Sequence, residues 1–97
     1  MEEIIWTREA EIWMKEIYDF IALDDKQKAS EVIDGIYEEA QILRKHPQIG
    51  YRYRKEPEGQ VRVLLYGHYR IAYLLTAKES IKVLGVYHGS LDIDRYF

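Results

Sequence analysis

Apolar and polar residues repeat with two different periods along the chain, and the period changes near Gly50. Before Gly50, apolar side chains recur every three or four residues, as on one face of an amphipathic helix. After it, they recur at every second residue in three runs rich in β-branched and aromatic side chains, as in half-buried strands. The pattern therefore predicts a helical first half and a sheet-forming second half.

Two helices are predicted in the first half, after a short apolar run at 3–6 that is a candidate first strand. Thr7 is expected to cap the first helix, and Asp24 and Asp25 are expected to end it and to cap the second. The second helix should end before Pro47, because the residue preceding a proline disfavours helical geometry. The predicted apolar stripes are Ala10, Trp13, Met14, Ile17 and Ile21 in the first helix, and Ala29, Val32, Ile33, Ile36, Ala40 and Leu43 in the second.

Three strands are predicted at 61–66, 69–76 and 81–88, and their short connections favour an antiparallel meander. The polar stretch 51–60, which contains Pro57 and Gly59, is a candidate edge strand followed by a loop. The predicted order is β-α-α-β-β-β. This is an α+β fold, a single domain over 1–97 in which a helical hairpin packs on one face of a small, mainly antiparallel sheet.

The turn at Gly67 and His68 decides whether Arg62 and Arg70 share a face of the sheet. A two-residue turn puts them on opposite faces, whereas a three-residue turn or a bulge puts them together. We expect the second arrangement, because it leaves no arginine beneath the helices. The residues then expected beneath the helices are Val61, Val63, Leu65, Ile71, Tyr73, Leu75, Ile81 and Val83, and those expected on the open face are Arg62, Leu64, Tyr66, Arg70, Ala72, Leu74, Lys82, Leu84, Val86 and His88.

The composition of the chain limits the kinds of catalytic and metal-binding site that it can contain. There are no cysteines, so disulfides, thiol nucleophiles and thiolate metal sites are absent, and the three histidines are too far apart for a local metal motif. We therefore expect neither a metal nor another cofactor. No apolar run approaches the ~20 residues that span a bilayer, and the acidic start differs from a basic secretory signal. These features predict a cytoplasmic domain without membrane contact.

Charge is distributed unevenly. Residues 1–45 carry twelve acidic and six basic side chains, and residues 46–97 carry five and eight, which together give the net charge of −3. A dedicated nucleic-acid-binding protein is usually basic overall, so the negative net charge of this chain argues against that class. The second half also holds most of the tyrosines, and tyrosine interleaved with arginine is typical of a contact surface for protein or RNA.

The ordered motifs of the chain resemble those of the RelE/ParE superfamily of toxins from bacterial type II toxin–antitoxin modules. The resemblance runs from the helix motifs "A...W...I..FIA" and "A..VI..I...A..L", through "HPQIG" and "VRVLLYGHYRIAYLL", to "IKVLGVYHGSLDIDRY". It implies the predicted fold, inhibition of growth, a role in plasmid stabilisation, and neutralisation by a small cognate antitoxin protein.

The superfamily divides by target. RelE-like members cleave mRNA on the ribosome with a basic sheet face, and ParE-like members lack that set of residues and poison DNA gyrase. The resemblance makes Arg62, Arg70 and His88 the catalytic candidates if the chain is RelE-like. Ser90 and Leu91, however, stand where many relatives have arginine.

We therefore favour a ParE-like toxin that acts on gyrase. His88 and Asp92 are then the end of a strand rather than an acid–base pair. The alternatives are a RelE-like, ribosome-dependent endoribonuclease and an inactive relative that only binds its antitoxin. The candidates for contact with a target or an antitoxin are Arg52, Arg54, Tyr66, Tyr87, Asp92 and Tyr96.

Overall fold

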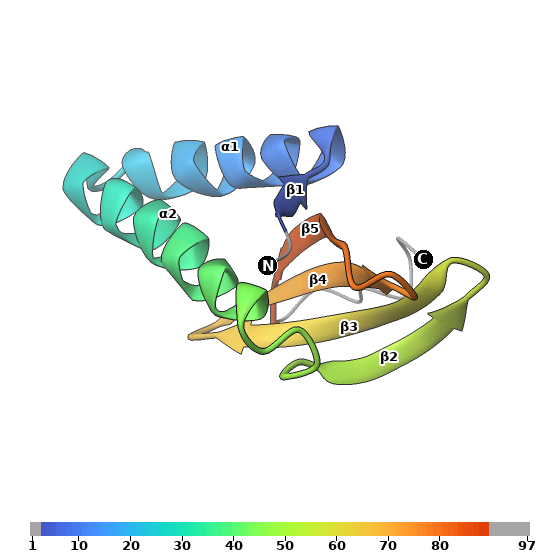
Figure 1. Cartoon of the computed structure of the whole chain (residues 1–97). Coiled ribbons are helices and arrows are strands. Elements are labelled where there is room, and N and C mark those ends of the chain that lie inside the picture. The colour runs from blue at the N-terminus through green and yellow to red at the C-terminus, as the bar shows by residue number, and fades with distance from the viewer. Residues whose placement is uncertain (1–2, 90–97) are drawn as a thin grey trace.

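A computed structural model describes residues 3–89 as a helical hairpin packed on a five-stranded sheet (Figure 1). In chain order the elements are β1 (Ile4–Trp6), α1 (Arg8–Ala22), α2 (Lys26–Gln41), the 3-10 turn η1 (Ile42–Arg44), β2 (Tyr51–Glu56), β3 (Gly59–Tyr66), β4 (Tyr69–Thr76) and β5 (Ile81–His88). The strands lie in the order β1-β5-β4-β3-β2; β1 is parallel to β5, and the other pairs are antiparallel. The predicted α+β fold class is confirmed.

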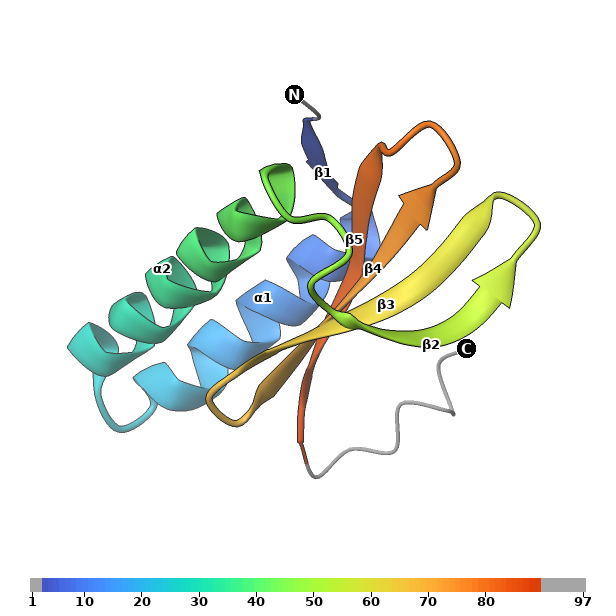
Figure 2. The same cartoon turned by 60° about the horizontal axis from the view of Figure 1, so that its bottom comes forward.

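The candidate edge strand at 51–60 is present as β2, at the free edge of the sheet (Figure 2). The loop expected after it is instead a two-residue turn of Pro57 and Glu58, because Glu56 pairs directly with Gly59. Proline fits this position, since it presets the backbone angle of a turn. The sheet therefore has one strand more than the predicted order.

Both helices begin at the predicted caps. The Thr7 hydroxyl accepts a hydrogen bond from the Ala10 amide at 3.2 Å and donates one to the Val83 carbonyl of β5 at 2.8 Å. The Asp25 carboxylate accepts the Lys28 amide at 3.0 Å. A cap of this kind stabilises a helix by about 1 kcal/mol. Because Thr7 also bonds to β5, the same side chain fixes where α1 lies on the sheet.

The main core lies between the helices and one face of the sheet, which we call the helical face. It joins Ala10 and Met14 of α1 to Ile36 of α2 and Leu43 of η1. The sheet contributes Leu64, Ile71, Tyr73, Leu75, Ile81, Val83 and Val86. The other face, which we call the second face, has a smaller buried cluster of Val63, Ala72 and Tyr87, with Trp13 and Tyr53 packed against it.

The expected register of β3 is wrong. Tyr66 pairs with Tyr69, so Gly67 and His68 form a two-residue turn, in which Gly67 has the positive φ of 55° that such a turn requires. The facing partners are consequently Arg62 with Tyr73 and Leu65 with Arg70.

Each residue of β3 therefore lies on the face opposite to the one expected. Leu64 and Tyr66 lie beneath the helices, and Val61, Val63 and Leu65 do not. Arg62 is on the helical face and Arg70 on the second face, so the two arginines do not share a surface.

A bulge also changes the face of the sheet on which the last side chains of β5 lie. The register between β4 and β5 shifts between Ala72 and Tyr73, which inserts one extra residue on β5. Ile81 and Val83 therefore face the helices as expected, but so does Val86, which was expected on the open face. His88 pairs with Tyr69 and falls on the same side as Val86.

The connection from η1 to β2 is held by one buried tyrosine. The Tyr73 hydroxyl donates to the Pro47 carbonyl at 2.7 Å and accepts the Gly50 amide at 3.0 Å. Burial raises the pKa of this hydroxyl, while the Gly50 hydrogen bond and the nearby charge of Arg62 act in the opposite direction. Tyr73 thus fixes the start of β2, and with it the position of the basic residues on that strand.

Candidate functional site

The three catalytic candidates are not brought together. Arg62 lies opposite Tyr73, and His88 lies opposite Tyr69 on the other side of β4. These two β4 positions are four residues apart, about 13 Å along the strand. Arg70 lies on the second face. Groups that transfer a proton must approach within about 3 Å of the reacting atom, so these three side chains do not form one acid–base site.

A shallow cavity of about 390 Å³ surrounds the β3–β4 turn and the end of β5. The rings of His68 and His88 lie nearly parallel with centroids 6.1 Å apart, and Tyr69 meets His88 edge-on at 5.6 Å. Arg70 donates a hydrogen bond through Nη2 to the Gly89 carbonyl at 3.2 Å. Burial raises the pKa of the Tyr69 hydroxyl above its ordinary value. The contacts place His88 in an aromatic cluster at the end of the strand.

The contact candidates are spread over both faces. Tyr66 lies under α2, so close to Gly35 that a side chain on Gly35 would clash with its hydroxyl. Tyr87 is 3% exposed and packs edge-on against Trp13, with ring centroids 4.8 Å apart. The last two candidates, Asp92 and Tyr96, lie outside the described residues.

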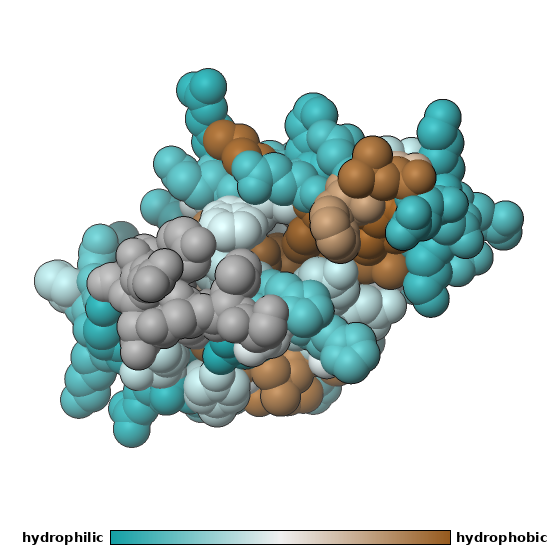
Figure 3. Space-filling view, turned by 180° about the vertical axis from the view of Figure 1, so that it is seen from behind, coloured by the Kyte–Doolittle hydropathy of each residue, from teal (hydrophilic) through white to brown (hydrophobic). Residues whose placement is uncertain are grey.

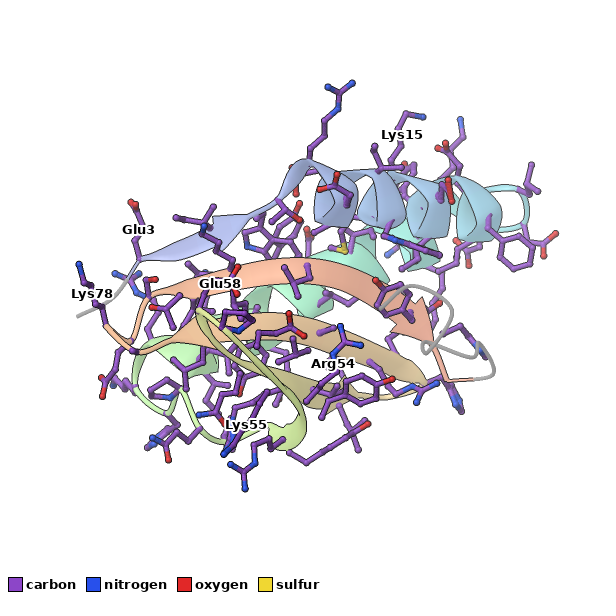
Figure 4. The ribbon with its side chains drawn as sticks, turned by 90° about the vertical axis from the view of Figure 1, so that its right-hand side faces the viewer. Glu3, Lys15, Arg54, Lys55, Glu58 and Lys78 are labelled. Atoms are coloured by element: carbon purple, nitrogen blue, oxygen red, sulfur yellow. The ribbon has the colours of Figure 1, made fainter. Side chains whose placement is uncertain are left out.

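The two arginines of β2 differ in their surroundings. Arg54 donates to the Glu56 carboxylate at 2.8 Å. Arg52 is exposed on the edge strand directly opposite Arg62. Figure 4 shows that Arg54 and Lys55 leave the strand on opposite sides, as successive residues of a strand do.

An apolar groove that sequence reasoning missed runs along the end of the helical hairpin. One part, of about 290 Å³, lies between α1 and the end of β5; it is lined by Trp13, Glu16, Ile17, Phe20, Ile21, Tyr69, Val86 and His88. The adjoining part, of about 460 Å³, reaches α2 and the β3–β4 turn and shares Ile21 and Tyr69. Phe20, which is 76% exposed, stands at its rim, and Leu23 close by in sequence is 82% exposed. We call these surfaces the hairpin-end groove.

The groove forms part of a visible apolar patch. Figure 3 shows hydrophobic side chains gathered at the end of the molecule where α1 turns into α2. Phe20 and Leu23 are apolar residues outside the stripe that α1 buries in the core. Apolar residues off the buried stripe of an amphipathic helix were the signal available in the sequence. Contiguous exposed apolar surface of this kind marks contact sites for other proteins.

The sequence pattern of the family described as "ParE toxin of type II toxin-antitoxin system, parDE" matches residues 4–93. The chain belongs to the ParE toxin family. A search of curated proteins gave no significant match. As a member of this family, the protein is of the class that forms the toxin component of type II toxin–antitoxin systems.

Two solved structures share the fold. A chain of the chromosomal ParDE toxin–antitoxin system from P. aeruginosa superposes with a TM-score of 0.73 at 24% identity, covering 91% of this chain and 96% of that one. A chain of the RelBE2 toxin–antitoxin complex from Mycobacterium tuberculosis gives a TM-score of 0.66 at 19% identity, covering 90% and 96%. Chains from a ParDE system and from a RelBE2 complex thus share this fold, so the fold does not by itself distinguish the two predicted targets. In the described part of this ParE-family chain, none of the helices is long and apolar enough to cross a membrane.

Proposed function

We propose that this ParE-family protein inhibits growth by binding DNA gyrase in the cytoplasm, and that it does not cleave mRNA. The observation that carries the proposal is the separation of Arg62, Arg70 and His88 over two faces and about 13 Å of β4. Metal-free RNA cleavage requires a base, an acid and phosphate-binding cations around one reacting phosphate. A toxin that acts by binding a protein needs no such cluster.

The second part of the proposal is a small cognate antitoxin protein that covers the hairpin-end groove. The solved relatives in ParDE and RelBE2 come from toxin–antitoxin systems, which supports a partner of this class. An amphipathic helix fits a groove of this kind, because its apolar face covers exposed side chains such as Phe20. Removing that surface from water favours the complex by roughly 25 cal/mol for each Å² of apolar area.

Replacing His88 with glutamine tests the absence of mRNA cleavage. Glutamine keeps a polar side chain at the end of β5 but cannot transfer protons near neutral pH. We expect His88→Gln to inhibit growth as strongly as the parent, per folded molecule, and to leave mRNA uncut in primer-extension assays. Melting curves on the same preparations separate loss of folding from loss of activity. Complete loss of toxicity in a variant that melts like the parent, together with mRNA cleavage by the parent, would establish the endoribonuclease instead.

A further inference from the structure

Three cations lie together on the helical side of the β2–β3 hairpin. Arg52 of β2 is paired directly with Arg62 of β3, so their side chains leave the sheet next to each other on the same face. Lys55 pairs with Gln60, which lies two residues from Arg62 and therefore on that face too. We call Arg52, Lys55 and Arg62 the β2–β3 cationic patch.

None of the acidic side chains in residues 3–89 forms an ion pair with the patch. Among the described residues, the ion pairs are Lys15 with Asp19 and Arg54 with Glu56, and neither includes a member of the patch. Arg54 pairs with Val61 across the strands and so faces the other way, which keeps Glu56 away from Arg52 and Arg62. Like charges directly opposite each other across two strands destabilise a sheet. The folded chain therefore maintains an unfavourable pair at this position.

Arg62 also has an unused hydrogen-bond donor. Its Nη1 donates to the Gln60 side-chain oxygen at 3.0 Å, but its buried Nε has no hydrogen-bond partner among the described residues. The guanidinium lies beside Tyr73. Two hydrogen bonds between the Tyr73 hydroxyl and the 46–50 loop fix the position of this neighbouring ring. A buried donor of a charged group without a partner is costly. A carboxylate has two oxygens and can bind the two terminal nitrogens of one guanidinium at the same time.

We propose that the β2–β3 cationic patch is a binding site for the carboxylate groups of an acidic segment of a partner protein. The helices explain why a protein carboxylate fits better than a nucleic acid. They pack on the same face of the sheet, and together they carry eight acidic and four basic side chains. A long polyanion that extends over that face would be repelled by the helices, whereas a short acidic segment contacts the patch alone. The site does not depend on the toxin's target.

The test uses the full chain and a hexaglutamate peptide, with hexaserine as the uncharged control, in an NMR titration at low salt that follows the arginine Nε–Hε signals. Arg52→Gln and Arg62→Gln each remove a charge-assisted contact, so we expect each to weaken hexaglutamate binding roughly tenfold or more. Arg8→Gln, the same substitution at an exposed arginine of α1, should leave the affinity unchanged.

The melting temperature gives a second, independent test of the proposal. Without peptide, Arg52→Gln should melt higher than the parent by roughly a few degrees, because it relieves the repulsion with Arg62. Equal peptide affinity in the parent and both patch variants would overturn the proposal, as would a lower melting temperature for Arg52→Gln. A twelve-nucleotide single-stranded RNA that binds more tightly than hexaglutamate, and through the same two arginines, would also overturn it, because the site would then recognise phosphate.

Discussion

Replacing Phe20 with glutamine should weaken antitoxin binding without affecting the fold. The side chain is 76% exposed on α1, and glutamine is a good helix former, so the free energy of unfolding should change by less than about 0.5 kcal/mol. When the antitoxin covers the hairpin-end groove, the same phenyl ring becomes buried. Burial of a phenylalanine side chain stabilises a complex by about 1.5–3 kcal/mol. The substitution should therefore raise the Kd roughly ten- to hundredfold.

The assay is isothermal titration calorimetry of the purified toxin with its cognate antitoxin, accompanied by a melting curve for each variant. Ile12 gives a matched control, because it is also on α1 and is 49% exposed, but it does not line the groove. Ile12→Gln should bind like the parent. If both substitutions weaken binding equally, or if Phe20→Gln has no effect, the antitoxin does not use the hairpin-end groove.

Two further predictions concern the buried and half-buried tyrosines. Tyr73→Phe leaves the Gly50 amide and the Pro47 carbonyl without their partner, so chemical denaturation should show a loss of about 1–3 kcal/mol; an unchanged stability would contradict the two hydrogen bonds. The Tyr37 hydroxyl donates to Glu11 at 2.7 Å, and burial followed by this contact raises its pKa to about 12. Because the folded pKa exceeds the unfolded value of about 10, the associated stability is complete below pH 10 and is lost as the pH rises toward 12. For Tyr37→Phe, the free energy of unfolding should fall less steeply with pH between pH 10 and pH 12 than for the parent. Identical slopes for the two proteins would refute the linkage.

The sequence predicted the helical hairpin well because its signals are local. Thr7 and Asp25 cap the helices from positions three residues before the amides they bind, so the information lies within one turn. The change of period after Gly50 likewise located the strands. These features depend on neighbouring residues and need no knowledge of the tertiary fold.

The register of β3 could not be predicted because both faces of the strand are apolar. Val63 packs in the second buried cluster and Leu64 in the main core, so hydrophobicity favours neither alignment. The expectation depended on keeping Arg62 away from the helices. The helical face, however, extends to the β2–β3 hairpin, where Arg62 lies beside Tyr73 and the loop that Tyr73 anchors. Polar side chains are tolerated at this end of the face.

The β4–β5 bulge had one signal in the sequence, Gly85, which our interpretation of 81–88 as a regular strand did not use. The extra residue is Leu84, directly before this glycine, and an isolated glycine within a strand pattern is typical of a bulge. Its effect is to turn Val86 and His88 toward the helical side. The candidate site therefore changed through pairing between strands, since a shift of one residue moves every following side chain to the other face.

The measurement that tests the central claim most directly is a cleavage assay with purified DNA gyrase, supercoiled plasmid, ATP and the purified toxin. After the reaction is stopped with detergent and protease, a toxin that poisons gyrase leaves linear DNA whose amount rises with toxin concentration. We predict this accumulation for the parent and for His88→Gln alike, and its suppression when the antitoxin is added first. Absence of linear DNA with active gyrase, together with ribosome-dependent cleavage of mRNA by the same preparation, would contradict the account.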